Sequence, residues 1–452
     1  MAILSSQFAV RLTVRFAACA VALFVCTPAL AQRPRPDRAY RGLFGGNGAD
    51  PNSSQQFDMN ISLFGAYDDN VLADRSQSGI DPRFQKSGGY AGGTLSLDYS
   101  KKADRASFDF TGGGSYRYYP SIKQMNGFNY WASLGFSAKL SSRTDFRATE
   151  SASYSPFYSF GGFPGLAPSV PGDVAPISPD YPLLEQAAIS LFSSASIDHR
   201  LTPRASLSAD YSLSYIDYRN QNQPFRNWGA GGRFSYRLSS RAGLHLGYHF
   251  RRGTYGLYYG NRPIDGHDID VGIDYNRALS FSRKTTVGFS TGSSIYRSFA
   301  PGVTTAISDW QYNTHYMVTG NAYLNRQIGR SWTARLDYRR GLQFVQGFPD
   351  PFFSDSVSAG VGGFMGPRSR LNFTAAYTTG SVGINISGRG YDSYTGVASY
   401  QFALGKWGAL FADYNYYHYV FDPTVPLPPG MSRGLDRQSV RGGLNLWLPL
   451  LR

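Results

Sequence analysis

Side chains that could carry out chemistry are widely separated along this sequence. The six histidines are scattered, and neither a metal-spaced group of ligands nor a serine nucleophile motif stands out. His245 and His249 share one face of an alternating segment, but four residues of β-strand span about 13 Å, too far for one metal ion. Both cysteines, Cys19 and Cys26, lie near the amino terminus, which excludes thiolate metal sites from the rest of the chain. The sequence therefore predicts no enzyme, no cofactor and no bound metal.

Charged side chains instead alternate with apolar ones. Asp268, Asp270 and Asp274, for example, alternate with isoleucine, valine and tyrosine. Since successive side chains of a β-strand point to opposite faces, such a segment has one apolar and one charged face. A wall that carries both signs of charge is typical of a water-filled channel. The predicted pore-lining residues are Arg117, Arg147, Arg233, Arg237, Arg251, Asp268, Asp270, Asp274, Arg335, Asp337, Arg339 and Arg441.

Two interpretations of this charged face stay open. In one, opposite charges pair directly across neighbouring strands. In the other, Arg233, Arg237 and Arg251 stand apart from the aspartates at 268, 270 and 274 and set up a field across the channel.

The overall charge is basic. The formal net charge is +14, and loss of Arg11 and Arg15 with the leading segment leaves +12. Arginine outnumbers lysine several-fold, which favours contacts with carboxylates, sulfates or phosphates. An anionic solute or an acidic polysaccharide is therefore the expected cargo, and binding of lipopolysaccharide phosphates on the outside is the alternative. Nucleic acid is not expected as a partner, because no basic cluster with a stacking platform occurs.

The elements that position these residues are long alternating segments. From Phe57 to the end, they run for about 11 to 15 residues, enough to cross a bilayer obliquely at ~9–11 residues. Short polar turns that end in a basic residue, such as 140–143 and 238–241, alternate with longer loops, as in outer-membrane barrels with periplasmic turns and extracellular loops. The sequence predicts an all-β, transmembrane antiparallel up-and-down β-barrel of about 18 strands (16–20) over 57–452. A soluble β-sandwich, propeller or solenoid would need a regular repeat, which is not found.

Aromatic residues make up 15% of the chain and crowd the loop-side ends of these segments. That is the place of an interfacial aromatic girdle, so we expect the barrel in the outer membrane, in contact with lipid and lipopolysaccharide. The girdle candidates include Tyr67, Tyr116, Tyr118, Tyr119, Tyr154, Tyr215, Tyr417 and Tyr419.

The amino-terminal end has two predicted parts. Residues 1–31 combine Arg11 and Arg15 with a short apolar core and a small-residue triplet ending at Ala31, the pattern of a cleaved secretory signal peptide. A lipoprotein signal ending at Cys19 or Cys26 is the alternative. Residues 32–56 mix arginine with proline and glycine and are predicted to form a flexible, basic periplasmic lead-in. The alternative is a tail that meets a periplasmic partner or inserts into the barrel.

The longest predicted loop, 156–185, is the third on the long-loop side. It contains seven prolines and the acidic residues Asp173, Asp180 and Glu185, but no basic residue. In general porins the third loop folds into the barrel and narrows it, and by that resemblance this loop is the predicted constriction. A surface-exposed loop is the alternative.

The last segment carries an assembly signal. Gly443, Leu446 and Leu448 resemble the terminal-strand pattern read by the barrel assembly machinery. The departure is the end itself, where residues 449–452 replace the usual terminal aromatic.

A short motif closes the first predicted strand. Tyr67, Asp68, Asp69 and Asn70, followed by Val71, resemble the signature of the β-barrel porin 2 group of outer-membrane proteins. The resemblance implies a barrel, a link to exopolysaccharide or capsule export components, and no defined catalytic residue. In chemical terms the acidic pair with asparagine suits a rim turn, and a divalent-cation site is the alternative.

Together these features predict an outer-membrane pore or conduit that passes small polar solutes or an anionic polysaccharide. The alternative is a structural or assembly barrel, plugged by its loops or lead-in, that anchors a periplasmic or surface partner.

Overall fold

The computed structural model of the chain describes most of the residues from 54 onward, and a few before them. The chain divides into two units, Met1–Arg38 and Ala39–Arg452, and all described residues belong to the second. No helix in the described part of the chain is long and apolar enough to cross a membrane. The described residues are 40, 43–44, 54–71, 87–121, 126–156, 187–218, 224–255, 263–278, 284–300, 311–343, 352–382, 390–425, 427 and 432–451.

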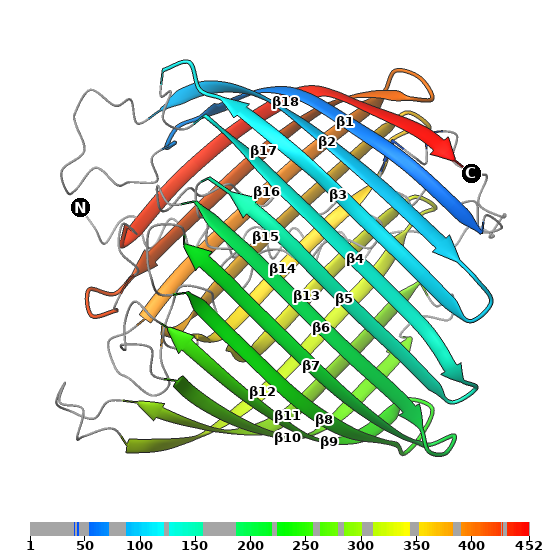
Figure 1. Cartoon of the computed structure of the whole chain (residues 1–452), viewed down its shortest axis with the longest axis vertical. Coiled ribbons are helices and arrows are strands. Elements are labelled where there is room, and N and C mark those ends of the chain that lie inside the picture. The colour runs from blue at the N-terminus through cyan, green and yellow to red at the C-terminus, as the bar shows by residue number, and fades with distance from the viewer. Residues whose placement is uncertain are drawn as a thin grey trace. The chain divides into compact units, whose positions relative to one another are not determined.

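Within these residues, eighteen strands form a single sheet (Figure 1). Figure 1 shows them running obliquely around the wall, each beside its neighbour in sequence. They are β1 (Gln55–Asp68), β2 (Gly88–Lys102), β3 (Ala106–Tyr118), β4 (Gly127–Ser141), β5 (Thr144–Ser155), β6 (Ala188–Arg200), β7 (Ala205–Tyr218), β8 (Phe225–Arg237), β9 (Ala242–Tyr255), β10 (Pro263–Ala278), β11 (Thr285–Ala300), β12 (Gln311–Ile328), β13 (Trp332–Gln343), β14 (Phe352–Phe364), β15 (Ser369–Val382), β16 (Gly390–Ala403), β17 (Gly408–Phe421) and β18 (Gly434–Leu451).

The sheet closes on itself. Every strand pairs antiparallel with its sequence neighbours, and β1 pairs with both β2 and β18. Closure leaves no strand edge with unpaired backbone groups, which is the condition for a sheet to span a membrane. The predicted 18-stranded up-and-down barrel is confirmed.

The outer face of the barrel is apolar. The pairing register joins Phe234, Leu246 and Val271 across β8, β9 and β10, and these side chains are 40%, 53% and 53% exposed. Similar exposed leucines, isoleucines and aromatics occur on the outer face around the sheet. An apolar belt of this extent on a closed antiparallel barrel faces lipid. The protein is therefore a transmembrane β-barrel of the outer membrane, as predicted.

Aromatic rings form a ladder at the loop-side ends of β3, β4 and β5. Ring centroids lie 4.4 Å apart for Tyr116 and Phe128, and 6.2 Å apart for Tyr130 and Tyr154. These rings occupy the position expected for the interfacial girdle.

Three of the predicted girdle residues are buried. Tyr119, just after β3, is 5% exposed and packs against Val71. Tyr417 and Tyr419 are 2% and 1% exposed and share the inner face of β17 with Asp413. The girdle prediction was wrong for them, because it used position along the strand and ignored the alternation of faces.

The ends of two strands depart from a regular ladder. Gly329, in the turn between β12 and β13, has φ +59°, a conformation that glycine adopts without a Cβ penalty. β18 continues to Leu451 and passes through Pro449, where its register with β1 shifts between Phe57 and Asp58. Proline has no backbone N–H to donate, and a bulge at this point lets the neighbouring residues keep their hydrogen bonds between the strands.

Candidate functional site: the inner wall of the barrel

Strand parity places all twelve predicted pore-lining residues on the inner face. The register sets each of them beside other charged residues or beside small or polar ones, as Asp274 lies between Gly243 and Ser290. The same register puts the exposed apolar belt on the opposite face. That these twelve residues line a path for solutes stays a prediction.

A compact network of charges joins β8 to β11. The Arg233 Nη2 atom lies 3.1 Å from the Asp274 carboxylate, and Ser290 donates to the same carboxylate at 2.7 Å. The buried ring of His245 lies between two carboxylates, with Nδ1 3.0 Å from Asp274 and Nε2 3.0 Å from Asp270. Opposite charges therefore pair directly here, and the separated field is not realised at Arg233 and Asp274.

Other predicted residues also form pairs on the inner face. The Arg335 Nε atom lies 2.7 Å from Asp337, and the Arg147 Nη1 atom lies 3.6 Å from Asp198. The side chain of Arg147 is 66% exposed, and exposed pairs of this kind contribute only about 0–1 kcal/mol. Their main consequence is a wall that is polar and hydrated.

Arg441 is packed more tightly than a solvated wall residue. Its side chain is 16% exposed, and its guanidinium lies 2.8 Å from Asp413. The guanidinium also stands 4.8 and 5.1 Å from the ring centroids of Phe64 and Phe411. Arg441 therefore connects β1, β17 and β18, and it stabilises the region where the first and last strands pair.

An arginine-rich cavity opens at the periplasmic ends of β6 to β12. Its volume is about 590 Å³. Ser290, Asn321 and Tyr323 supply hydroxyl and amide groups. The arginines that line it are Arg200, Arg204, Arg233, Arg237 and Arg241.

Three of these arginines are left for a ligand. Arg200 lies 4.0 Å from Asp145 and Arg233 is bonded to Asp274, whereas Arg204, Arg237 and Arg241 form no ion pair with any residue that the structure describes. We define these three as the free arginine group.

Sequence reasoning missed most of this cavity. Arg204 and Arg241 end two of the short turns, and such turn residues were used only to locate the turns. Arg237 was among the predicted pore-lining residues. The signal was nevertheless present, because a basic residue ends most short turns, and the closure of the sheet brings two neighbouring turns to one rim.

The inner wall differs between its two sides. On β14 to β16, inward serines and threonines are buried, with Ser354 2% and Thr378 0% exposed. On β17, Tyr417 and Tyr419 are also buried. Inward residues of β2 to β13 are mostly half-exposed. We call β14 to β18 the covered sector and β2 to β13 the open sector.

The Tyr67 to Asn70 motif fastens the first strand to the last. The Arg437 Nε atom lies 2.9 Å from the Asp68 carboxylate, and both side chains are buried, at 8% and 2% exposure. The backbone N–H of Asn70 donates to Asp68 at 2.9 Å, and its side chain donates to the Asp436 carbonyl. The backbone N–H of Gln438 donates to Asp69 at 2.7 Å.

These bonds are those of a rim turn, the chemistry favoured for the motif. In the described part of the chain, no group of three histidine, cysteine or acidic residues could hold a metal ion. Val71 is fully buried and packs against Tyr119, and burial raises the pKa of the Tyr119 hydroxyl above its ordinary value.

The predicted assembly signal lies on both faces of β18. Leu446 and Leu448 point outward beside Ile61 and Met59, and Gly443 lies on the inner face beside Phe64. A side chain at Gly443 would meet the backbone of β1, so close strand pairing requires glycine there. Recognition by the assembly machinery stays a prediction.

Several predictions fall outside the described residues. They concern the signal peptide over 1–31, most of the lead-in over 32–56, and the constriction loop with Asp173, Asp180 and Glu185. They stay predictions.

No protein-family model and no curated protein matches the chain. Solved structures similar to it include Pseudomonas aeruginosa OpdL, with 13% identity, a TM-score of 0.39, and coverage of 88% of this chain and 99% of that one. OccK2 (OpdF) from the same organism, in complex with glucuronate, has 12% identity, a TM-score of 0.41, and coverage of 88% and 98%. Acinetobacter baumannii OccAB4 has 13% identity, a TM-score of 0.41, and coverage of 89% and 100%. The assignment of the barrel rests on the observed strand pairing and not on this likeness.

Proposed function

We propose that the barrel is a passive outer-membrane channel for small polar solutes and that it favours anions. The observation that supports this most directly is the free arginine group in the periplasmic cavity of the open sector. The proposed work requires no chemical step.

The mechanism follows from charge and hydration. Guanidinium groups present planar sets of donors that match carboxylate and phosphate oxygens. Fixed positive charge that lines a water-filled cleft in a protein wall raises the local concentration of anions. The neighbouring pair of Arg233 and Asp274 keeps the net field moderate, so an anion is attracted without being trapped, as conduction requires.

Single-channel recording in planar bilayers under a salt gradient tests this function. We expect steady conductance, with a reversal potential that is displaced from zero toward the equilibrium potential of the anion. The triple substitution Arg204→Ser, Arg237→Ser and Arg241→Ser should reduce the anion-to-cation permeability ratio several-fold, because it removes the free arginine group.

The matched control removes the same charge elsewhere. Arg105, Arg143 and Arg330 lie in or beside other short turns, and replacing all three with serine should leave most of the selectivity intact. An unselective wild-type channel, or equal losses in both triple variants, would contradict the anion preference.

A plugged structural barrel is the second candidate. The covered sector favours it, since inward side chains of β14 to β18 are shielded from water. A correctly folded barrel that conducts no current, and that retains a periplasmic or surface protein after solubilisation, would replace the channel with this function.

The exopolysaccharide link implied by the Tyr67 to Asn70 resemblance is a finer proposal. Because acidic sugars carry carboxylates, the free arginine group is the contact we would expect for them. Acidic oligosaccharides added to an open channel should interrupt the current, and neutral oligosaccharides of equal length should do so less. Equal interruption by both would remove the support for an acidic polysaccharide.

A further inference from the structure

An apolar patch lies on the inner wall at the periplasmic end of the covered sector. Ala403 ends β16, Ala409 is the second residue of β17, and Trp447 lies near the end of β18. All three point inward and are at most 8% exposed. Phe364, which ends β14, packs against the same group. We call these four residues the apolar dock. A patch of this kind on a hydrated wall requires something to cover it.

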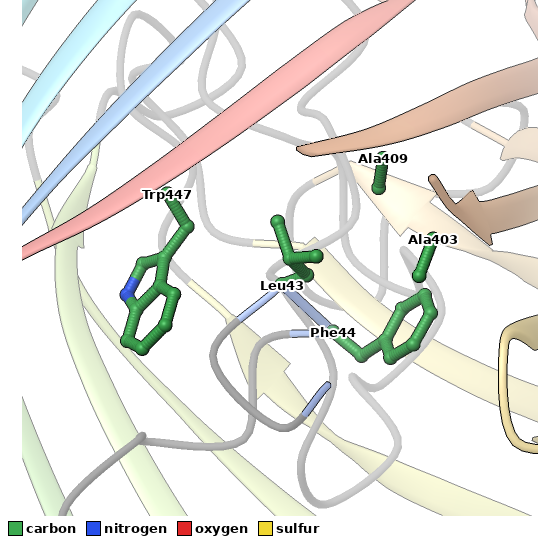
Figure 2. Close-up of a cluster of buried hydrophobic side chains, with 5 residues drawn as sticks. All are labelled: Leu43, Phe44, Ala403, Ala409 and Trp447. Atoms are coloured by element: carbon green, nitrogen blue, oxygen red, sulfur yellow. The ribbon is translucent and has the colours of Figure 1, made fainter. Parts of the chain in front are cut away.

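The cover is a piece of the chain that precedes the barrel. Leu43 and Phe44 are 6% and 2% exposed and belong to the same cluster as the dock. Figure 2 shows Leu43 between Trp447 and Phe44, and the ring of Phe44 beside Ala403. The rings of Phe44 and Phe364 meet edge to face, with centroids 5.4 Å apart, a favourable aromatic geometry.

Polar contacts hold the same piece of chain. The buried guanidinium of Arg370, on the inner face of β15, donates to the backbone carbonyl of Phe44. The Arg368 guanidinium stands 5.8 Å from the ring centroid of Tyr40, and the Leu43 N–H donates to the Tyr40 carbonyl at 3.2 Å. Both the side chains and the backbone of this piece are therefore bound to the wall.

From these contacts we infer that Tyr40, Leu43 and Phe44 act as an internal ligand of the barrel, which occupies the dock and narrows the periplasmic half of the channel. The piece precedes β1 by about ten residues of chain, so its effective concentration at the dock is high and modest contacts are enough to hold it. Solutes are left with the open sector, where the free arginine group lies. Docking does not depend on the proposed channel function, whereas narrowing does.

The first experiment releases the piece from the dock. Leu43→Asp combined with Phe44→Asp places two charges in the apolar contact, and both positions lie outside the strands, so the barrel should still close. We expect single-channel conductance above that of the wild type, with unchanged heat-dependent mobility in gel electrophoresis as the check on folding. A folded double variant with wild-type conductance would overturn the narrowing.

A peptide in trans makes the same test reversible. A synthetic peptide of residues 39–48, added on the periplasmic side of the double variant, should return the conductance toward the wild-type value. The same peptide with both aspartates is the control and should have no effect. Equal effects of the two peptides would also count against the dock.

The second experiment measures docking without any current. In a full chain with Cys19→Ser and Cys26→Ser, the pair Phe44→Cys and Ala403→Cys should be joined by a short flexible bismaleimide. The control pair is Phe44→Cys and Ser235→Cys, because Ser235 points inward on β8, eight strands from Ala403 on β16. Equal cross-linking of both pairs, or none with Ala403→Cys, would overturn the docking. If only the pair with Ala403→Cys is cross-linked and the barrel conducts no current, the docking is supported and the proposed channel function is rejected.

Discussion

Arginine has two distinct roles inside this barrel. Arg437 is buried against Asp68 at the seam between β1 and β18, and the largely shielded Arg441 pairs with Asp413 on the neighbouring strand β17. Arg237 and Arg241 border water in the periplasmic cavity without an acidic partner in the described chain. Burial of a guanidinium is costly unless a carboxylate pairs with it. The first role is therefore structural, whereas arginines in the second group can contact solutes.

The buried pair at the rim gives a stability prediction. Arg437→Met leaves the Asp68 carboxylate buried without its ion-pair partner, which costs about 3–5 kcal/mol. Arg252→Met removes a more exposed pair with Asp265 and should cost about 1 kcal/mol or less. Urea unfolding in lipid vesicles measures both values. Similar small losses would show that the motif does not fasten the seam.

At the scale of the element, the periplasmic turns bring successive strands into register. Most of them are short and end in a basic residue, but the turn from β12 to β13 contains Gly329 with φ +59°. An L-residue with a Cβ is disfavoured in that conformation by roughly 1–2 kcal/mol. The turn therefore depends on its glycine in a way that other turns do not.

Gly329→Ala should accordingly destabilise the barrel by about 1–2 kcal/mol. Gly405→Ala, in the turn from β16 to β17, is the matched control, since Gly405 has open space around its Cβ position and no positive φ is recorded there. Unfolding midpoints in urea compare the two. A larger loss from the control would contradict the role assigned to the turn conformation.

At the scale of the whole molecule, the two faces of the barrel meet different solvents. Leu95, in the middle of β2, points outward and is 44% exposed, whereas Thr94 points inward beside Ser62 and Ser115. The same change of side chain should therefore have opposite consequences at adjacent positions.

Leu95→Arg puts a charge on the lipid face and should cost about 2–4 kcal/mol near the middle of the membrane. Thr94→Arg puts it on the hydrated inner face and should cost far less. Folding equilibria in lipid vesicles measure both changes. A greater loss for Thr94→Arg would reverse the assignment of the faces.

The alternation of polar and apolar residues was enough to predict the strands and their two faces. It is a local property, because each side chain's face follows from its position in the strand. The alternating segments were expected to run for about 11 to 15 residues, and the observed strands have 12 to 18 residues. The rim turn at Asp68 to Asn70 was likewise favoured from side-chain chemistry that acts within a few residues.

Only the tertiary structure decided which residues meet. Arg233 and Asp274 are 41 positions apart in sequence, and Arg370 and Phe44 are 326 positions apart. The first contact depends on the register of β8, β9 and β10. The second depends on the closed sheet, which brings the chain before β1 beside the last strands. The sequence by itself determined a barrel with a polar interior. The pairing and closure of the sheet decided which charges pair, where the free arginine group gathers, and that Tyr40, Leu43 and Phe44 contact the inner wall.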